Sequence, residues 1–205
     1  MKYPWLEIAQ QIQSIAQAGL TFCENKYDIE RYQQLQKMAG QIMADFTDTE
    51  MEKVEQLFLN QTGYQTPKVD VRGVVFRDNK ILLVRETIDN CWSLPGGWAD
   101  VGHTPREVVE KEVQEEAGLE VQAERIVAVL DKKCHPHPPS PFYVYKIFFL
   151  CKEVGGTLGG GMETSDVQFF ELKQLPELSA ERNTISQIQL MFDFLKNPDK
   201  EIVFD

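Results

Sequence analysis

The hydrophobic period of the chain changes near residue 67, and this change limits the fold more than any other feature. Before it, apolar residues recur every three or four positions, as Ile8, Ile12 and Ile15 do, which is the spacing of one helix face. After it, Val69–Phe76 and Ile81–Val84 are apolar, β-branched runs of the kind found in buried strands. The sequence therefore predicts a helical segment followed by a sheet-based segment.

Two further helices are predicted before residue 67. One carries an apolar stripe made of Leu35, Met38, Ala39, Ile42, Met43 and Phe46. The other follows Thr47–Glu50, a capping-box pattern, and has Met51, Val54, Leu57 and Phe58 along one side. The turn-rich stretch Gln61–Pro67 then makes a linker. We therefore expect residues 1–66 to form an all-α extension, for dimerisation or for capping the substrate site, ahead of a domain at residues 67–205.

Residues 67–205 alternate strands with helices. The first two strands are joined by Arg77-Asp78-Asn79-Lys80, which predicts a hairpin. Further strands are predicted at Arg125–Leu130, Phe142–Cys151 and Val167–Leu172, and an amphipathic helix at Thr184–Leu195. Strands interleaved with helices are typical of an α/β or α+β sandwich.

The charge and cysteine content exclude several classes of function. A net charge of −11 argues against nucleic acid as the main partner, because a phosphate backbone is bound by a positive surface. Small phosphorylated ligands remain open, since a metal ion can supply local positive charge. The four cysteines show no C-x-x-C spacing, no run is long enough to span a bilayer, and the N-terminus lacks the plan of a signal peptide. We therefore expect a cytoplasmic protein that binds neither DNA nor a membrane.

The segment from Gly96 to Leu119 carries the chemistry. Thr104 suits a helix N-cap, Pro105 suits the first turn and Glu107 completes a capping box, while Gly118 is a C-terminal stop. The predicted helix therefore occupies roughly residues 105–117.

Three glutamates lie on one face of this predicted helix. Glu112, Glu115 and Glu116 stand at i, i+3 and i+4, which places them within a sector of about 100°. Clustered carboxylates repel one another, and a hard cation such as Mg²⁺ or Mn²⁺ turns that repulsion into coordination. The alternative is a solvated acidic face with Lys111 nearby, because charge runs on helices are common.

The preceding loop favours the metal site. The stretch resembles the Nudix box, G-x5-E-x7-R-E-U-x-E-E-x-G-U with U apolar, and the lead-in Trp92-Ser93-Leu94-Pro95-Gly96-Gly97 is typical of that family. Seven residues fall at positions of the box: Gly97, Glu112, Val113, Glu115, Glu116, Gly118 and Leu119. The resemblance covers about residues 69–195. It implies an αβα sandwich with a mixed sheet, in which the box forms the metal-binding loop and helix.

Two residues depart from the box. His103 stands where the family has its first glutamate, and Lys111 stands where it has arginine. In the family these two side chains help brace the loop against the helix, so the departures affect the loop geometry and the number of metal ions. The E-x-x-E-E core is intact, and hydrolysis remains the expectation.

The resemblance implies cleavage of a pyrophosphate bond by a metal and an activated water. We expect Glu112, Glu115 and Glu116 to hold the metal, with the Gly97 carbonyl completing its shell. The general base is either one of these glutamates or Glu163, which lies in a glycine-containing loop before a strand. A solvated surface role is the alternative for Glu163.

Three residues near the predicted site are candidate substrate contacts. Arg85 ends a strand and could meet phosphate, Trp98 could stack on a base, and His103 lies in the same loop as Trp98. Two other segments have open interpretations. Cys134–Pro139 is an ordered loop beside the substrate cleft or, less in keeping with its prolines, a zinc site. Gly155–Gly161 is a flexible lid or a plain connector.

On resemblance, the first expectation is an ADP-ribose pyrophosphatase that forms AMP and ribose 5-phosphate, as small bacterial Nudix proteins with a helical extension are generally labelled. CDP-choline or another nucleoside diphosphate conjugate is the alternative substrate. A different class, a non-catalytic nucleotide sensor, is motivated by the altered box and the added helices. Those helices carry five basic and nine acidic residues, so a homodimer suits them better than DNA binding.

Overall fold

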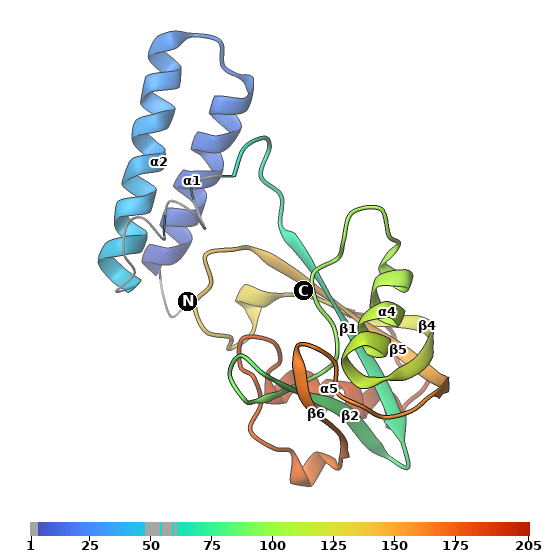
Figure 1. Ribbon diagram of the computed structural model, residues 1–205. Coiled ribbons are helices and arrows are strands. Elements are labelled where there is room, and N and C mark those ends of the chain that lie inside the picture. Colours follow the sequence, from blue (N-terminus) through green and yellow to red (C-terminus); the bar gives the residue numbers. More distant parts are fainter. Residues whose placement is uncertain (1–3, 48–53, 55–58, 60) are drawn as a thin grey trace. The chain divides into compact units, whose positions relative to one another are not determined.

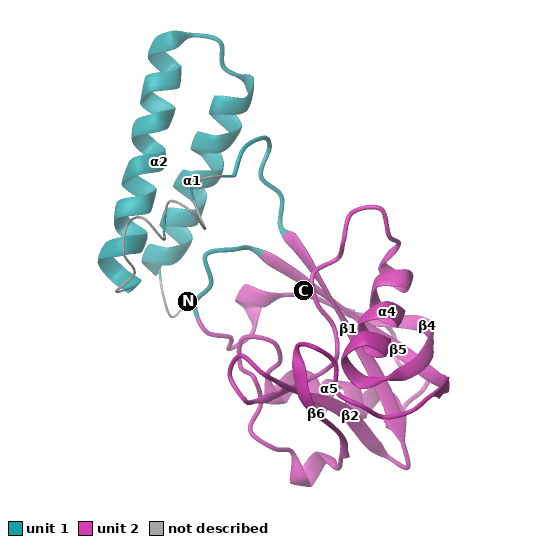
Figure 2. Ribbon diagram, viewed as in Figure 1, with its two compact units in different colours: residues 1–67, 139–143 teal, residues 68–138, 144–205 magenta. Residues whose placement is uncertain are grey.

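The computed structural model describes residues 4–47, 54, 59 and 61–205. The chain divides into two compact units (Figure 2). Residues 1–67 and 139–143 form the first, and residues 68–138 and 144–205 form the second. The division agrees with the predicted change from a helical segment to a sheet-based segment near residue 67.

The first unit contains two of the predicted helices, α1 (Pro4–Phe22) and α2 (Lys26–Thr47). Their apolar stripes meet in a small core of Ala9, Ala39 and Met43 with Val54. The rings of Trp5 and Phe46 stack at a centroid distance of 5.2 Å and tie the two helices together near the end of α2. The third predicted helix, which begins after Thr47, lies almost wholly outside the described residues.

The second unit is built on one mixed sheet. Its strands in the described residues are β1 (Lys68–Arg77), β2 (Lys80–Glu86), β3 (Trp92–Ser93), β4 (Leu119–Asp131), β5 (Val144–Gly156), β6 (Thr164–Phe170) and β7 (Val203–Phe204). Their order is β3-β2-β1-β5-β4-β7, and β6 also pairs with β2. β1 runs parallel to β5 and antiparallel to β2. The predicted hairpin is confirmed: Asp78 and Asn79 have φ values of 50° and 59°, as a tight primed turn requires.

Two helices cover opposite faces of this sheet (Figure 1). On one face α4 (Pro105–Ala117) packs its valines against Val71, Val75 and Leu82. On the other face α5 (Ile185–Lys196) packs Ile188 and Met191 in a second core with residues of β1, β2 and β5. The expected αβα sandwich with a mixed sheet, preceded by a helical segment, is confirmed.

Several strand ends differ from the expectation. β4 begins at Leu119, directly after α4, whereas its sequence pattern predicts a start at Arg125. The residues from Leu119 to Glu124 alternate between buried and exposed, and the register shift between Ala123 and Arg125 separates them from the more apolar run that follows. The short β3 and β7 were not predicted, because two-residue strands leave almost no periodic signal. Two 3₁₀ helices, Lys132–Cys134 and Leu172–Gln174, follow β4 and β6.

Candidate active site

The helix α4 begins and ends as its sequence predicts. The Thr104 hydroxyl accepts a hydrogen bond from the backbone N–H of Glu107 at 3.3 Å, and the Glu107 carboxylate accepts one from the N–H of Thr104 at 2.7 Å. This is a complete capping box. At the other end Gly118 adopts the left-handed conformation, with φ of 71°. The helix that carries the three glutamates is therefore fixed at both ends.

Glu116 joins the end of α4 to the glycine loop. Its Oε2 accepts a hydrogen bond of 2.8 Å from the backbone N–H of Gly96, and its side chain is buried. Gly96 has φ of 143°, and a Cβ there would overlap the carbonyl oxygen of Val71. Only glycine therefore allows the loop to pass between β1 and the carboxylate.

Glu112 lies one turn earlier on the same side of α4. Its carboxylate oxygens are 3.2 Å from the point where a Cβ at Gly97 would stand, so this side chain also reaches the loop. The carbonyl oxygen of Gly97 accepts a hydrogen bond from the N–H of Val71 at 2.9 Å, and its second lone pair is available to a further partner. The loop Gly96–Gly97 is thus where two carboxylates converge.

Glu115 does not join them in the structure. Its side chain is 60% exposed and its Oε2 lies 3.8 Å from Nζ of Lys111. On a helix, residues i and i+4 are separated by roughly 40°, whereas i+3 lies about 60° to the other side, toward solvent here. In residues 4–47, 54, 59 and 61–205, no three acidic, histidine or cysteine side chains come together as a ready-made cation site.

The electrostatics around Glu116 are unfavourable to its charge. Burial raises the pKa of Glu116 to about 8, and the charges of Glu86 and Glu112 act in the same direction against the opposing effect of Arg72. Burial also raises the pKa of Glu112, to which Glu115 and Glu163 add. Burial and neighbouring negative charge therefore both disfavour the ionised forms of these two carboxyl groups.

A buried ion-pair network lies next to this loop. Arg72 pairs with Asp70 through both Nε and Nη2, at 2.8 and 2.7 Å, and donates from Nη1 to the carbonyl of Leu94 at 3.0 Å. Lys146 of β5 reaches the same Asp70 carboxylate at 2.8 Å. Burial by itself would raise the pKa of Asp70, but its two cationic partners hold it at about 2. Two cations thus share one carboxylate, and the field of Arg72 also reaches Glu116.

Sequence reasoning missed this network and a second acidic residue, Glu86. The signal was available, because Asp70 and Arg72 interrupt an apolar strand and Lys146 interrupts another. Glu86, at the end of β2, accepts from the Ser93 hydroxyl at 2.6 Å and pairs with Nε of Arg182 at 2.7 Å. Glu86 and Arg182 are far apart in the sequence, so no sequence pattern indicates that they pair. The charge of Glu86, like that of Glu112, opposes ionisation of Glu116.

Glu163 lies close to Glu112 although the two are far apart in sequence. The charge of Glu163 contributes to the raised pKa of Glu112. Its backbone carbonyl accepts from both the N–H and the hydroxyl of Thr87, each at 3.0 Å. The loop before β6 lies against the helix that carries Glu112 and Glu116, and its Glu163 side chain is exposed.

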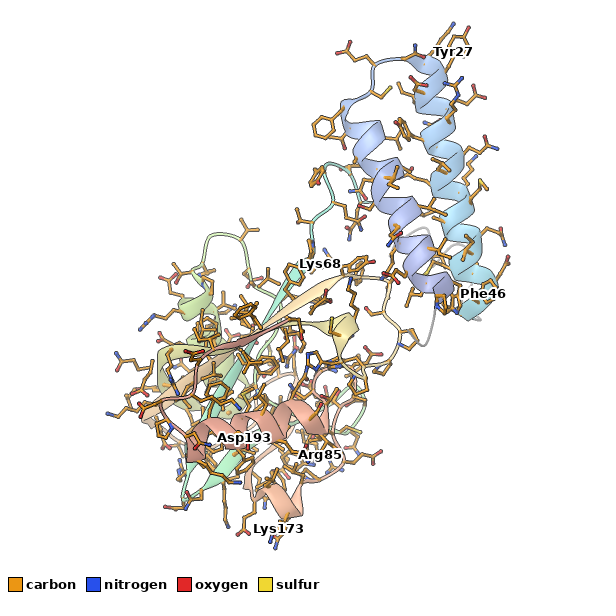
Figure 3. The ribbon with its side chains drawn as sticks, turned by 180° about the vertical axis from the view of Figure 1, so that it is seen from behind. Tyr27, Phe46, Lys68, Arg85, Lys173 and Asp193 are labelled. Carbon is orange, nitrogen blue, oxygen red and sulfur yellow. The ribbon has the colours of Figure 1, made fainter. Side chains whose placement is uncertain are left out.

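The three candidate substrate contacts are placed differently. Trp98 is half exposed and its backbone forms a bridge with Asp70, so it lies beside the glycine loop. His103 is exposed at the far end of the same loop. It makes a small contribution to the lowered pKa of Glu107, which is caused mainly by the hydrogen bonds from Thr104. Arg85 pairs in the sheet with Trp92, a residue of the core under α5, and bonds the carbonyl of Asn90 at 3.2 Å. Figure 3 shows Arg85 from the side on which α5 covers the sheet. The structure does not bring Arg85 to the carboxylates on the α4 face.

Lys111 finds a different partner from the one expected by analogy with the box. Its Nζ lies 3.3 Å from Oδ2 of Asp100, which precedes His103 in the loop. The pair is exposed and contributes little stability. It nevertheless links the loop to the helix where a histidine cannot.

The histidines of Cys134–Pro139 serve structural contacts. His135 pairs with Asp205 at 3.1 Å, and Nδ1 of His137 donates to the carbonyl of Ala180 at 2.7 Å. In the part of the chain that the structure describes, no cluster suited to zinc contains them. This agrees with the interpretation of the segment as an ordered loop.

The donor set around the glycine loop fits a hard divalent cation. Carboxylates of Glu112 and Glu116 and the carbonyl of Gly97 are oxygen ligands of the kind that Mg²⁺ and Mn²⁺ take. Burial is the main cause of the raised pKa of both carboxyls, and their mutual repulsion adds to it for Glu116. A cation placed there would relieve this repulsion, with Glu115 as a further oxygen donor on the same helix.

Family models match both parts of the chain. Residues 66–191 match the model of the NUDIX domain, and residues 3–58 match a model described as a UDP-X-like, N-terminal oligomerisation domain. A protein of Bacillus subtilis (strain 168), provisionally named ADP-ribose pyrophosphatase YjhB, is 49% identical over 98% of this chain and 97% of its own length.

Two of the solved structures that are similar to the chain share more than 30% of its sequence. The crystal structure of an ADP-ribose pyrophosphatase from Streptococcus suis 89-1591 has a TM-score of 0.63 and 44% identity, and it covers 68% of this chain and 100% of its own. The crystal structure of a UDP-X diphosphatase has a TM-score of 0.64 and 33% identity, and it covers 98% of both chains.

Proposed function

The chain belongs to the Nudix family and is a pyrophosphohydrolase, and from this premise we propose that it cleaves ADP-ribose to AMP and ribose 5-phosphate with the help of Mg²⁺ or Mn²⁺. The observation that carries the proposal is the convergence of Glu112 and Glu116 on the loop Gly96–Gly97. Among the described residues, neither carboxylate forms an ion pair. A diphosphate would bring further negative charge to the same place.

The metal would be held by Glu112, Glu115 and Glu116, with the Gly97 carbonyl. When bound, it supplies positive charge that neutralises the diphosphate oxygens and stabilises the leaving phosphate. The protein holds these ligands by packing α4 on the sheet through Val109 and Val113, and by the Glu116–Gly96 hydrogen bond.

Glu163 is the general base in this proposal. It is an exposed carboxylate near Glu112, and it can accept the proton of the water that attacks one phosphorus atom. The P–O bond to the other phosphate then breaks, and that oxygen leaves with the second product. Glu115 and Glu116 are the alternatives for the base, because either could take the proton if the other groups hold the metal.

The substrate follows from the relatives and from the loop beside the carboxylates. A Bacillus subtilis relative and a Streptococcus suis structure are both named for ADP-ribose pyrophosphatase activity. Trp98, half exposed on the loop, offers an aromatic face to a base, and His103 lies further along it. A UDP-linked conjugate is the second candidate, because the UDP-X diphosphatase structure is similar over nearly the whole of this chain, including the helical segment. CDP-choline belongs in the same test.

A substrate panel tests the proposal directly. ADP-ribose, UDP-linked sugars, CDP-choline, NADH and nucleoside triphosphates would each be incubated with the full chain, with Mg²⁺, with Mn²⁺ and with a chelator. We expect AMP and ribose 5-phosphate from ADP-ribose, and no turnover with the chelator. If a UDP conjugate is cleaved faster than ADP-ribose, the UDP conjugate takes the place of ADP-ribose in the proposal. Tight binding with no turnover of any compound would instead support a sensor.

We also propose that α1 and α2 form a homodimer contact. Ile8, Ile15 and Phe22 stand seven residues apart on α1, and all three are more than half exposed. Residues at this spacing lie along one side of a helix, which makes an apolar stripe that a second copy could cover. The match of residues 3–58 to an oligomerisation domain supports this role.

The cytoplasm is the compartment that we propose for the reaction. No helix among the described residues is long and apolar enough to cross a membrane. The four cysteines are free thiols, as a reducing compartment allows.

A further inference from the structure

The glycine-rich segment after β5 is bonded to the end of the helix that carries the glutamates. The N–H of Thr157 donates to the carbonyl of Gly118 at 3.0 Å, and the N–H of Gly159 donates to the carbonyl of Ala117 at 3.1 Å. Carbonyls at the end of a helix lack partners inside it and must find them elsewhere. The segment supplies those partners, so it has a defined place against α4.

One side chain extends this contact to Glu116 itself. The Thr164 hydroxyl donates to the backbone carbonyl of Glu116 at 2.7 Å and accepts from the N–H of Gly161 at 2.8 Å. Thr164 is 3% exposed, so this hydroxyl is shielded from water and from any ligand. A buried hydroxyl with both a donor and an acceptor partner holds two backbone segments at a fixed spacing.

The loop that carries Glu163 is held between two contacts. On one side, Gly161 lies so close to α4 that a Cβ there would overlap the carbonyl oxygen of Glu115. On the other side, Thr87 donates two hydrogen bonds to the carbonyl of Glu163. Thr164 therefore stands where the loop of Glu163 meets the helix of Glu116.

We propose that Thr164 is a positioning residue for hydrolysis, whose hydroxyl sets the loop of Glu163 against the end of α4 so that Glu163 and Glu116 act on the same diphosphate. This inference rests on the proposed function. Thr164 is buried, and it acts through the two backbone segments that it joins.

Three single variants test the role of the hydroxyl. Thr164→Val keeps the shape and removes the hydrogen bonds, Thr164→Ser keeps the hydroxyl, and Ser165→Ala removes the neighbouring exposed hydroxyl, which bonds the carbonyl of Arg85 at 3.3 Å. We expect Thr164→Val to lower kcat by about tenfold or more, in keeping with the loss of two buried hydrogen bonds, with KM within about threefold. The serine and Ser165→Ala variants should keep kcat within about threefold. Thr164→Val with unchanged kcat overturns the proposal.

A double variant separates positioning from a general loss of stability. If Thr164 acts through Glu163, Thr164→Val should cost little in a Glu163→Gln background, because the group that it positions is already gone. Equal losses of kcat in the two backgrounds would show that the hydroxyl acts elsewhere. Thermal unfolding of each variant, measured alongside, reports whether the fold is kept.

Amide hydrogen exchange on the unmodified chain gives a test that needs neither a variant nor turnover. We expect the Gly161 N–H to be protected to about the same degree as the last amides of α4, because it donates to a buried hydroxyl. Exchange at the unprotected rate would overturn the positioning role even if the enzyme is active. If no substrate is turned over while the Gly161 N–H is protected, the proposed function is wrong. The contact that Thr164 makes between the loop and α4 would still stand.

Discussion

The backbone N–H of Gly96 donates a 2.8 Å hydrogen bond to Oε2 of Glu116, and this bond joins the loop after β3 to the last turn of α4. It holds a carboxylate in a place where burial raises its pKa to about 8. The protein thus buries a carboxyl group whose ionised form is disfavoured, which is the arrangement expected of a residue kept for chemistry rather than for stability.

Glu116→Gln separates these two roles. The amide oxygen of glutamine can still accept from Gly96, while the charge is lost, so the fold should remain as stable as that of the unmodified chain. We expect kcat on the preferred substrate to fall by at least about a hundredfold, since a metal ligand contributes several kcal/mol to the barrier reduction. Steady-state kinetics at saturating Mg²⁺ measures this.

Glu124→Gln is the matched control, because Glu124 is an exposed glutamate on β4 outside the site. Its turnover should equal that of the unmodified chain. If Glu116→Gln retained full activity, or if both variants lost activity equally, the assignment of the metal site to α4 would be wrong.

The buried ion pairs of Asp70 predict a large effect on stability. Asp70→Asn removes the charge that Arg72 and Lys146 share and leaves two buried cations without compensation. We expect the free energy of unfolding to fall by about 3–5 kcal/mol, measured by urea denaturation. Glu171→Gln, which breaks the exposed Lys80–Glu171 pair, should cost less than about 1 kcal/mol. Similar losses in the two variants would contradict the role given to Asp70.

The sequence was sufficient to predict α4 but not all of its surroundings. Local signals, namely the capping residues Thr104 and Glu107 and the stop at Gly118, act within a few residues and were confirmed. The helical period also placed Glu112 and Glu116 together. It could not show that Glu115 turns toward Lys111, because a spacing fixes a face of the helix and not a rotamer.

Long-range partners were the features that the sequence could not reveal. Glu86 and Arg182 meet across 96 positions of chain, and Thr164 meets Glu116 through a backbone carbonyl. A carbonyl has no residue-type signature, so no motif marks such a contact. The sequence for that reason leaves the glycine-rich segment open between a lid and a connector, whereas its amides bond the end of α4.

The apolar stripe of α1 predicts how the oligomer can be broken. Ile15 is 61% exposed in the middle of the stripe. Ile15→Glu would place a charge in the proposed contact, and we expect sedimentation analysis to show a monomer where the unmodified chain is a dimer. Gln122→Glu adds the same charge at an exposed position of β4 and should leave the dimer intact. A dimer that survives Ile15→Glu would place the contact elsewhere.

His137 is neutral in the folded chain because its ring is partly buried and its Nε2 faces a hydrogen-bond donor. Its Nδ1–H donates to the Ala180 carbonyl at 2.7 Å, and its Nε2 lies 3.1 Å from Nε2 of Gln187. Gln187 uses Oε1 to accept from the N–H of Thr184, so its amide nitrogen faces the ring and donates to it. A proton on Nε2 of His137 would point at the N–H of this amide, so the protonated ring is disfavoured. Burial, with the charges of Lys146 and Lys132, lowers the pKa of His137 to about 4.

This lowered pKa predicts a loss of stability in mild acid. The pKa of the unfolded histidine is about 6.5, so the unfolded chain binds the proton first as the pH falls. The contribution of His137 to stability is therefore complete above pH 6.5 and is lost progressively toward pH 4. Between pH 7 and pH 5 we expect the unmodified chain to lose about 1 kcal/mol more than His137→Gln, after allowing for the partial exposure of the ring. Urea denaturation at both pH values measures the difference. Carboxylates that titrate in the same range affect both proteins alike, so the difference between the two losses reports on His137 alone. Equal losses would mean that the ring is not held neutral.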